Sequence, residues 1–585
     1  MHKLLFNKLS SSARRYDATF QGLWPVALLL LVTFVAYSSV LSAGFIWDDD
    51  AYVIDNICLR TADGLSAIWF EPGATPQYYP VVFSLFWLQF KLWGLAPLGY
   101  HVVNITLHGA NAVLLRYSLK RLNIAAAFWI AALFALHPVH VESVAWITEL
   151  KNVLSTFFVL ITFLLYWRFN EIRLQPVPVR AYRLYAGALF VFLLALLSKS
   201  VVGSLPAVIL LLIWWQQGRF SRLDLFRLVP FFLLALVTGW NTARLEVSHV
   251  LASGAEWDFS FTERVLIAGR AIWFYAAKLL WPYPLAFNYE RWRIDATLWW
   301  QYLFPLGVIA VAAALWLLRG KIGRGALAGY LFFIGTLFPA LGFINVYPMR
   351  YSFVADHFQY AASIGVLTLF AVSARGLAGK FPLPFGVVQC FAAGVLLLLA
   401  MLTWRQGQIY HDRLTLFGDT INKNPQSWLS YANRGRDYAL LGREDLALAD
   451  IEKALALNPN DADSLMVRGA IALKNRDFES ALADMNRSIE IYPFKIHYLR
   501  NRSLANRNAG RIREAVADAS QIIMLAPDDP QSYVYRASLY AAAGDLAAAK
   551  ADIGMAEMMG LQLDDNEKIK IMSVPRLQSS GRGDR

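Results

Sequence analysis

Long runs of apolar residues fill residues 22–404, and they restrict the fold of this chain more than any other feature of its sequence. A helix needs about 20 consecutive, mainly apolar residues to cross the hydrocarbon core of a bilayer. The candidate spans are residues 22–43, 101–119, 124–138, 151–169, 182–198, 201–216, 225–241, 297–318, 325–344, 359–376 and 384–403. The sequence therefore predicts an all-α fold that begins with a polytopic membrane helix bundle of about 11 spans.

The charged residues between these runs predict how the bundle is oriented. Lys3, Lys8, Arg14 and Arg15 precede the first run. If the N-terminus is cytoplasmic, the cytoplasmic segments carry 19 basic and three acidic residues, whereas the first outside loop, residues 44–80, carries six acids and one arginine. Such a bias is typical of membrane proteins, which keep basic residues on the cytoplasmic side. We therefore predict a multi-pass protein of a cell inner membrane, with its N-terminus in the cytoplasm and its C-terminal part in the periplasm.

Two further apolar stretches, residues 80–95 and 264–281, are ambiguous. Counting residues 264–281 as a span would place Arg270 and Lys278 in lipid, where each costs about 2.5–3.5 kcal/mol on insertion scales. We therefore expect a helix at the outer interface or a re-entrant segment there. The net charge of +12 does not indicate nucleic-acid binding, because the positive charge lies mainly in the short loops between apolar runs.

A period of 34 residues marks the C-terminal part as a repeat array. Proline and alanine recur at this period, and glycine recurs at the turn between two helices, where Arg476 replaces it in one unit. The recurring residues are Pro425, Pro459, Pro493, Pro527, Ala447, Ala481, Ala515, Ala549, Gly442, Gly510 and Gly544. This is the tetratricopeptide period, whose paired helices stack into an α-solenoid. We predict a membrane domain over residues 1–404, a periplasmic tetratricopeptide-repeat domain over 405–561 and a flexible tail over 562–585.

Three consecutive carboxylates, Asp48, Asp49 and Asp50, follow the first apolar run. Carboxylates this close raise each other's pKa or share a cation, and either property suits a general base or a metal-assisted site. The alternative is a solvated acidic cap that only enforces the outside topology. We predict no certain cofactor. If a divalent cation, Mg or Mn, is bound, its ligands would come from Asp48, Asp49 and Glu142.

A second polar cluster lies between the third and fourth runs, on the same side of the membrane as the carboxylates. It contains His137, His140, Glu142, Glu149, Lys151 and Asn152. Two histidines and a glutamate so close together suggest zinc, but the spacing is not the helical His-x-x-x-His of zinc peptidases. The cluster is therefore interpreted either as a substrate-binding site or as an amphipathic interfacial turn with capping polar groups.

Further polar residues fall on this side in the topology that the charges predict. They are Lys199, Tyr289, Arg350, Tyr351, Asp356 and His357. Lys199 follows the fifth run, where a lysine either extends its amine to the interface or holds a lipid phosphate. Acids and bases together suit a substrate with a phosphate and a polar acceptor. Neither a P-loop nor a nucleotide-binding glycine fingerprint occurs in a strand–helix context, so a nucleotide sugar on a Rossmann domain is not expected.

The order of these motifs resembles the GT-C superfamily of polytopic glycosyltransferases. It is most similar to the membrane-plus-tetratricopeptide-repeat proteins akin to the animal transmembrane O-mannosyltransferases. The matching pieces are Phe45 to Asn56, His137 to Trp146 with Lys151 and Asn152, Ser198 with Lys199, Trp281 to Tyr289, Ala355 with Asp356, Ser363 to Gly365, and the repeats. The resemblance covers nearly the whole chain in the same order.

This resemblance implies an inverting transfer of a sugar from a polyprenyl-phosphate-linked donor to Ser or Thr hydroxyls of an exported protein. Asp48 or Asp49 would act as the base or as a metal-side ligand, and Glu142 would be the second acidic residue of the catalytic site. Lys199 and Arg350 would bind the donor phosphate, and the repeat groove would present the acceptor protein. The residues that would bind substrate are His137, His140, Lys151, Asn152, Tyr289, Tyr351, Asp356 and His357.

The late loop departs from the family pattern. Asp356, His357 and Phe358 stand where Asp-Arg-Tyr is usual, and Ser200 follows the Ser-Lys pair where a glutamate is usual. These departures leave the late-loop roles and the donor sugar open. Two alternatives also remain open: the same chemistry on a lipid or surface-glycan acceptor, and a non-catalytic envelope assembly scaffold whose repeats do the binding.

Overall fold

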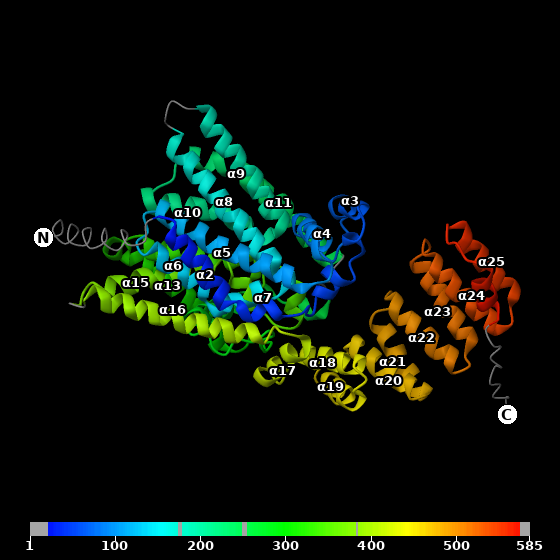
Figure 1. Ribbon diagram of the computed structural model, residues 1–585. Helices are drawn as coiled ribbons and strands as arrows, with labels where there is room; N and C mark the ends of the chain where they lie inside the picture. Colours follow the sequence, from blue (N-terminus) through cyan, green and yellow to red (C-terminus); the bar gives the residue numbers. More distant parts are fainter. Residues whose placement is uncertain (1–21, 174–177, 249–253, 382–383, 574–585) are drawn as a thin grey trace. The chain divides into compact units, whose positions relative to one another are not determined.

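The computed structural model describes residues 22–173, 178–248, 254–381 and 384–573. The chain divides into two compact units, Met1–Asn424 and Pro425–Arg585 (Figure 1). Every regular element in the described part of the chain is a helix, which confirms the all-α prediction there.

The predicted domain boundaries stay predictions, and the compact units divide after Asn424 rather than after residue 404. Of the predicted tail, Asp565–Met572 form helix α26, and residues 574–585 lie outside the described residues. The basic residues near the N-terminus, on which the predicted orientation partly depends, also lie outside them.

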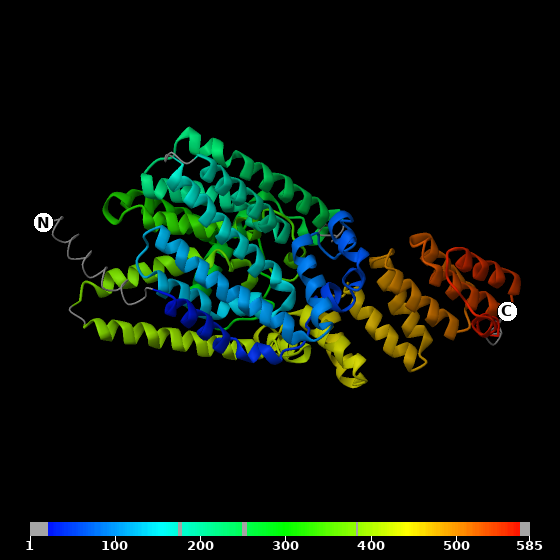
Figure 2. The same cartoon turned by 45° about the horizontal axis from the view of Figure 1, so that its top comes forward.

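The first unit is a bundle whose long helices run side by side in both views (Figures 1 and 2). Its helices are α2 (Trp24–Ala36), α3 (Asp63–Phe70), α4 (Pro80–Trp93), α5 (Pro97–Arg121), α6 (Ala127–Leu136), α7 (Val141–Ala145), α8 (Leu150–Ile172), α9 (Pro178–Ser198), α10 (Leu205–Gln217), α11 (Arg222–Ser248), α12 (Phe261–Leu280), α13 (Leu303–Ile322), α14 (Gly325–Leu337), α15 (Ser363–Ala378), α16 (Phe385–Gln408) and α17 (Arg413–Lys423).

Six helices among the described residues are long and apolar enough to cross a membrane, so the first unit has the make-up of a multi-pass membrane domain. They cover Ile147–Ile172, Val179–Ser198, Ser200–Gln217, Arg222–Glu246, Trp299–Ile322 and Gly386–Gln408. Helices α6 and α7 would add a seventh if they form one span bent by 54°. Shorter apolar helices occupy Trp24–Ala36, Gly325–Ala340 and Ser363–Ala378. The count of eleven spans stays a prediction.

Helix α5 is long enough to be a span but is not apolar throughout. Its polar side chains face the interior of the bundle. His108 Nδ1 lies 2.7 Å from the Tyr360 hydroxyl, and Asn111 Nδ2 donates to the Val153 carbonyl at 2.8 Å. Both side chains are fully buried. Buried polar groups are tolerated when they are hydrogen-bonded, so α5 can serve as a polar centre of the bundle.

Helix α12 covers the ambiguous stretch at residues 264–281 and has one buried and one exposed face. The Arg270 guanidinium on it lies 4.4 Å from the centre of the Trp292 ring, which covers the charge. Trp281 and Trp299 nearby are 73% and 74% exposed. Exposed tryptophans are enriched at the boundary between membrane and water. This arrangement supports the expectation that α12 lies at an interface, which stays a prediction.

The second unit consists of the paired helices that the 34-residue period predicts. They are α18 (Trp428–Leu440), α19 (Glu444–Leu457), α20 (Ala462–Lys474), α21 (Phe478–Ile491), α22 (Ile496–Asn508), α23 (Ile512–Leu525), α24 (Pro530–Ala543), α25 (Leu546–Met558) and α26. Gly442, Gly510 and Gly544 have φ of 71°, 77° and 84°, and Arg476 adopts the same left-handed backbone with φ of 62°. The left-handed backbone conformation, which glycine adopts easily, is therefore also present where arginine replaces glycine.

An arginine–aspartate pair recurs inside every repeat. Arg434 contacts Asp450, and each later repeat forms the same pair 34 residues further on: Arg468 with Asp484, Arg502 with Asp518, and Arg536 with Asp552. We call these four pairs the Arg–Asp ladder. Each arginine lies on the first helix of its repeat and each aspartate on the second, so the ladder joins the two helices of every unit.

Candidate active site

The candidate site lies at the end of the first unit where several loops meet, and Trp47 is their common contact. Its ring stacks on Trp146 with centroids 5.4 Å apart, and it meets the rings of Phe287 and Tyr351 edge to face at 5.1 and 6.2 Å. Trp47 has φ of 41°, a left-handed conformation that is uncommon for a bulky residue. These contacts hold the strained residue in place and bring four distant parts of the sequence together.

Asp49 is fully buried, and its carboxylate accepts three hydrogen bonds. The donors are the backbone N–H of Ile46 at 2.9 Å, the backbone N–H of Thr148 at 2.8 Å and the Thr148 hydroxyl at 2.6 Å. Burial raises the pKa of Asp49 to about 7, although these hydrogen bonds act in the opposite direction. Asp49 therefore joins the first loop to the segment before α8, and little of its carboxylate is left for a substrate.

Asp48 differs from Asp49, because its half-buried carboxylate accepts no hydrogen bond from the described residues. Burial raises the pKa of Asp48 to about 6, while the nearby charge of Lys151 lowers it. A carboxylate that is ionised near neutral pH, partly desolvated and free of donors is suited to accept a proton. Of the two predicted bases, the geometry favours Asp48.

Asp50 and the loop around it are held by α17. Arg413 Nη1 lies 2.6 Å from Asp50 Oδ2, and at the other end of the helix Lys423 Nζ donates to the Leu285 carbonyl at 2.7 Å. Phe417 on α17 is fully buried, and its ring centre lies 6.4 Å from that of Phe287. The ring centre of Tyr410 lies 6.3 Å from that of Phe287. Helix α17 is therefore packed into the core of the first unit and contacts two of the loops that build the site.

Glu149 is the centre of a buried cluster with two lysines. Its carboxylate lies 2.9 Å from Lys151 Nζ and 3.4 Å from Lys199 Nζ, and Lys199 also donates to Asn152 Oδ1 at 2.7 Å. Burial lowers the pKa of Lys199 to about 8, and Lys151 acts in the same direction while Glu149 opposes it. Two ammonium groups that share one carboxylate favour a further anion, because an added negative charge relieves the repulsion between them.

Two carboxylates of the predicted site are held by hydrogen bonds within the protein. Glu142 lies 2.7 Å from His357 Nδ1 and accepts the His357 backbone N–H at 3.2 Å. Tyr289 donates its hydroxyl to Asp356 at 3.0–3.1 Å. Burial and the charge of Glu142 raise the pKa of Asp356 well above its ordinary value. Glu142 therefore orients His357, and Asp356 connects the late loop to Tyr289.

His137 and His140 face backbone carbonyls at the bend between α6 and α7. His137 Nε2 lies 3.1 Å from the Leu279 carbonyl, while His140 Nδ1 and Nε2 lie 2.7 Å from the Phe134 carbonyl and 2.9 Å from Ser363 Oγ. Both histidines are buried. The geometry gives them a positioning role, and their predicted contact with substrate stays a prediction.

Arg350 lies in the late loop but forms an ion pair away from the lysine cluster. Its Nε is 2.9 Å from Glu256 Oε2, and its guanidinium lies 5.8 Å from the Tyr351 ring centre. The structure thus places Lys199 with Lys151 and Asn152, and pairs Arg350 with Glu256. The predicted role of Arg350 in binding a donor phosphate stays a prediction.

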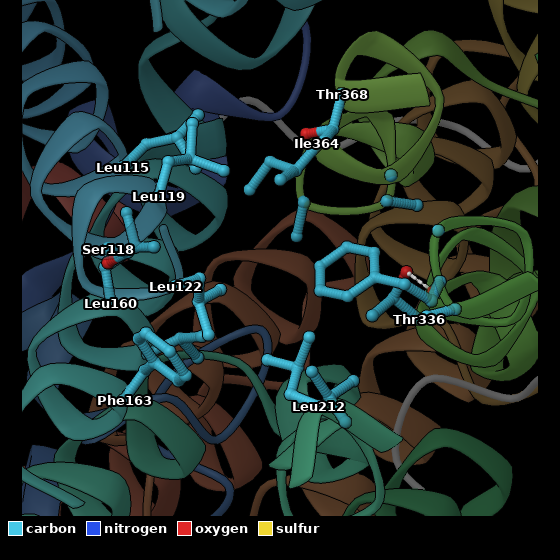
Figure 3. Close-up of a pocket in the computed structure, with 18 of the residues that line it drawn as sticks. Leu115, Ser118, Leu119, Leu122, Leu160, Phe163, Leu212, Thr336, Ile364 and Thr368 are labelled. Carbon is cyan, nitrogen blue, oxygen red and sulfur yellow. Dashed lines mark hydrogen bonds between the residues drawn. The ribbon is translucent and has the colours of Figure 1, made fainter. Parts of the chain in front are cut away.

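A cavity of about 640 Å³ lies inside the bundle next to this cluster (Figure 3). Its walls are mainly apolar and come from α5, α8, α10, α14 and α15, including Leu119, Leu160 and Leu212, which point into it in Figure 3. Asn152 and His357 line the same cavity. Asn152 is the residue that contacts both Glu149 and Lys199, so the cavity connects an apolar interior with the polar cluster.

The predicted metal ligands are not grouped around a common point. Among the described residues, no three His, Cys, Asp or Glu side chains are placed to hold a metal ion together. The oxygens of Asp49 and Glu142 face hydrogen-bond donors of the protein instead. These residues do not form an oxygen cage for Mg or Mn, and a bound cation stays a prediction.

The sequence places Glu149 in the second polar cluster but assigns no role to it, to Tyr52 or to Glu246. The Tyr52 ring centre lies 5.1 Å from Lys151 Nζ, and the Tyr52 hydroxyl donates to Gln77, whose amide donates to Glu246 at 2.8 Å. A sequence signal existed for Glu149 and Glu246, because each is an acid at the end of an apolar run, where an unpaired charge is costly. Their partners could not be read from the sequence.

Comparisons with known proteins find several protein O-mannosyl-transferases that are similar to this chain. A protein O-mannosyl-transferase of Caenorhabditis elegans is 27% identical over 513 residues, which cover 79% of this chain and 67% of that protein. A protein O-mannosyl-transferase of Homo sapiens is 26% identical over 76% of this chain and 56% of its own length. Another, of Mus musculus, is 30% identical over 24% of this chain. The chain spans 67% of the nematode protein but only 16% of the mouse protein.

The family model described as tetratricopeptide repeat matches residues 430–461. The resemblance that the sequence motifs predict is therefore confirmed: homologues of this chain are O-mannosyl-transferase family proteins, and its C-terminal part carries tetratricopeptide repeats.

Proposed function

We propose that the chain is a membrane glycosyltransferase that moves a sugar from a polyprenyl-phosphate-linked donor to Ser or Thr hydroxyls of an exported protein. The names of the relatives support glycosyl transfer to protein hydroxyls and suggest mannose as the sugar. The observation that carries the donor assignment is the apolar cavity lined by Asn152, which accepts a hydrogen bond from Lys199 in the lysine cluster.

The shape of the cavity suits a long hydrocarbon chain. Gly325 and Thr336, both on α14, line it, and eleven residues of helix correspond to about 16 Å. Apolar walls over such a length favour an extended lipid tail, because burying its carbons contributes about 25 cal/mol per Å². The tail would lie among α5, α8, α10 and α14, with its phosphate toward Asn152 and His357.

The lysine cluster suits the phosphate. Lys199 is protonated in most molecules at neutral pH, since its pKa is lowered only to about 8. Lys151, held by Glu149 and by the rings of Tyr52 and Trp146, adds a second positive charge. When the bond between the sugar and the phosphate breaks, its electron pair stays on the phosphate oxygen. Two ammonium groups stabilise that charge as it develops.

Asp48 supplies the base. In the proposed step the hydroxyl oxygen of a Ser or Thr bonds to the anomeric carbon, and the hydroxyl proton moves to the Asp48 carboxylate. The attack occurs on the face opposite the phosphate, so the configuration inverts. Asp49, through Ile46 and Thr148, holds the loop that carries this base. No step requires a metal ion.

In this proposal the site end of the bundle faces the periplasm, the first unit spans an inner membrane and the repeats present the acceptor protein. The orientation rests on the excess of basic residues in the other loops. The repeat role rests on the extended binding surfaces that such arrays form.

The test is transfer by the purified full chain in lipid nanodiscs, with radiolabelled polyprenyl-phosphate mannose and a Ser/Thr-rich peptide. We expect labelled peptide with the wild type and at least a hundredfold less with Asp48→Asn. Asp63→Asn, at an exposed position in the same loop, is the matched control and should transfer normally. Full activity of Asp48→Asn would refute the assignment of the base.

A glycoproteomic comparison of envelope proteins from a deletion strain complemented with each variant addresses the acceptor. Loss of a sugar from defined Ser or Thr sites, restored by the wild type alone, supports protein transfer. An unchanged glycoproteome together with labelled lipid or surface glycan would favour the alternative acceptor. No labelled product of any kind would favour the scaffold.

A further inference from the structure

Helix α22, the first helix of the third repeat, carries three arginines, Arg500, Arg502 and Arg507, and no acidic residue. Arg502 belongs to the Arg–Asp ladder and contacts Asp518 and Asn486. Arg500 is exposed and Arg507 half-buried, and neither guanidinium has an ion pair or hydrogen bond with the described residues. Two of the three charges on this helix are therefore available to a partner.

The repeat period separates the arginines that the fold needs from those that it does not. Arg502 recurs in all four repeats, as a structural residue should. The residues that correspond to Arg500 are Ala432, Met466 and Val534, and those that correspond to Arg507 are Ala439, Leu473 and Ala541. The other repeats therefore fold with apolar side chains at both positions, so packing does not account for the two arginines of the third repeat.

The two arginines share one face of α22. Arg500, Leu504 and Arg507 follow the spacing i, i+4, i+7, which places them in one row along a helix. Leu504, between the two charges, is 39% exposed. Tyr535 on α24 borders this row, since its hydroxyl donates to Ser503 Oγ at 2.9 Å. Burial raises the pKa of Tyr535, while the hydrogen bond with Ser503 and the charges of Arg507 and Arg500 act in the opposite direction.

We propose that Arg500, Leu504, Arg507 and Tyr535 form a docking surface for an acidic segment of the acceptor polypeptide. This rests on the proposed function, in which the repeats receive the acceptor. Arginine clusters recognise carboxylates through charge-assisted hydrogen bonds. The seven-residue offset from Arg500 to Arg507 corresponds to about 10 Å of helix. An extended segment spans a similar distance in three residues, so the partner carries two acids at positions i and i+3.

The measurement is fluorescence anisotropy with the full chain in phosphatidylcholine nanodiscs. The probe is a labelled 12-residue peptide with two glutamates three residues apart, and the matched probe has glutamine at both positions. We expect the double variant Arg500→Gln, Arg507→Gln to bind the acidic probe at least tenfold more weakly and with a shallower salt dependence. The control is Arg513→Gln, an exposed arginine on α23 of the same repeat, and it should bind normally.

Equal binding of the two probes, or unchanged affinity of the double variant, would overturn the proposal. Binding of phosphatidylglycerol vesicles without binding of the acidic probe would also overturn it, in favour of a lipid surface. Sugar transfer to a short Ser/Thr peptide without acidic residues tests the proposed function independently of the docking surface. The double variant should retain transfer to this short peptide. If the wild-type chain itself does not transfer sugar to it, the proposed function is refuted, and the peptide-binding result alone then decides the docking proposal. Matching thermal melts establish that the variants fold.

Discussion

The site end of the first unit and the repeats of the second unit use the same kinds of charged side chain in opposite ways. In the repeats, each ladder arginine contacts its own aspartate, and the same pair returns every 34 residues. In the site, Lys151 and Lys199 share the single carboxylate of Glu149, and Asp48 has no hydrogen-bond donor among the described residues. Charges are matched one to one in the Arg–Asp ladder and left unequal in the site.

This difference distinguishes charged side chains that stabilise the fold from charged side chains that remain available to bind a ligand. Removing one partner of a matched pair leaves the other charge buried without compensation, so it lowers stability. Removing a charge that has no partner relieves strain or changes nothing in the fold, so its effect appears in activity. Variants at individual positions show on which side of this division each residue falls.

The largest effect is expected at Asp48. Asp48→Asn should lower transfer by about 10²–10⁴-fold, the contribution of a general base. Its thermal midpoint should equal or exceed that of the wild type, because an unpartnered, half-buried charge is removed. Rates and melting curves of the two proteins provide the check. A lowered midpoint with normal transfer would place Asp48 among the structural charges.

A smaller effect on free energy is expected in the Arg–Asp ladder. Arg502→Ala should lower the free energy of unfolding of the repeat unit by about 2 kcal/mol, between the values for exposed pairs and fully buried pairs. A urea titration monitored by far-ultraviolet circular dichroism measures this free energy. Arg500→Ala, two residues away, should change stability by less than about 0.5 kcal/mol. Equal losses from both variants would contradict the distinction between matched and free arginines.

The pH dependence of transfer should show the raised pKa of Asp48. Burial raises this pKa to about 6, so the carboxylate is protonated below pH 6 and the rate should fall up to tenfold per unit there. Above pH 6 the base is ionised, and its contribution to the rate should be constant. A profile of kcat/KM between pH 4.5 and 7.5 measures the midpoint. A midpoint near 4, the ordinary value for aspartate, would argue that Asp48 is solvated.

The smallest effect is expected for the ion pair that joins α17 to the first loop. Asp50→Asn or Arg413→Met should each lower transfer by roughly tenfold, because the loop of Asp48 loses one of its attachments. The exchange Asp50→Arg with Arg413→Asp should restore part of the rate, since the attraction returns with reversed polarity. The rates of the three variants, each compared with the wild type, provide the check. No recovery in the exchanged variant would mean that the pair has no positioning role.

Different parts of the molecule could be predicted from the sequence to different degrees. The repeats follow from local spacing alone, and even the left-handed turn at Arg476 could be anticipated from its position in the period. Asp48, Lys151, Lys199 and Asn152 could be assigned to one end of the bundle because the charge bias predicts a common side for their loops.

Partners within the site could not be predicted in the same way. Glu149 binds two lysines and Arg350 binds Glu256, and both outcomes depend on how the helices pack rather than on sequence spacing. His137 and His140 suggest a ligand site by residue type, yet carbonyls from Leu279 and Phe134 face their rings. Residue type indicates what a side chain can bind, while long-range packing decides what it meets.

The attachment of α17 to the first loop also sets when the site can be complete during synthesis. Asp50 and Arg413 are separated by 363 positions, so the loop that carries Asp48 leaves the ribosome long before its partner exists. At about 5–20 residues per second, that delay is roughly 20–70 s. A nascent or truncated chain that ends before α17 would hold its acidic loop without this anchor. Assembly order alone would thus keep an unfinished chain from assembling the complete site.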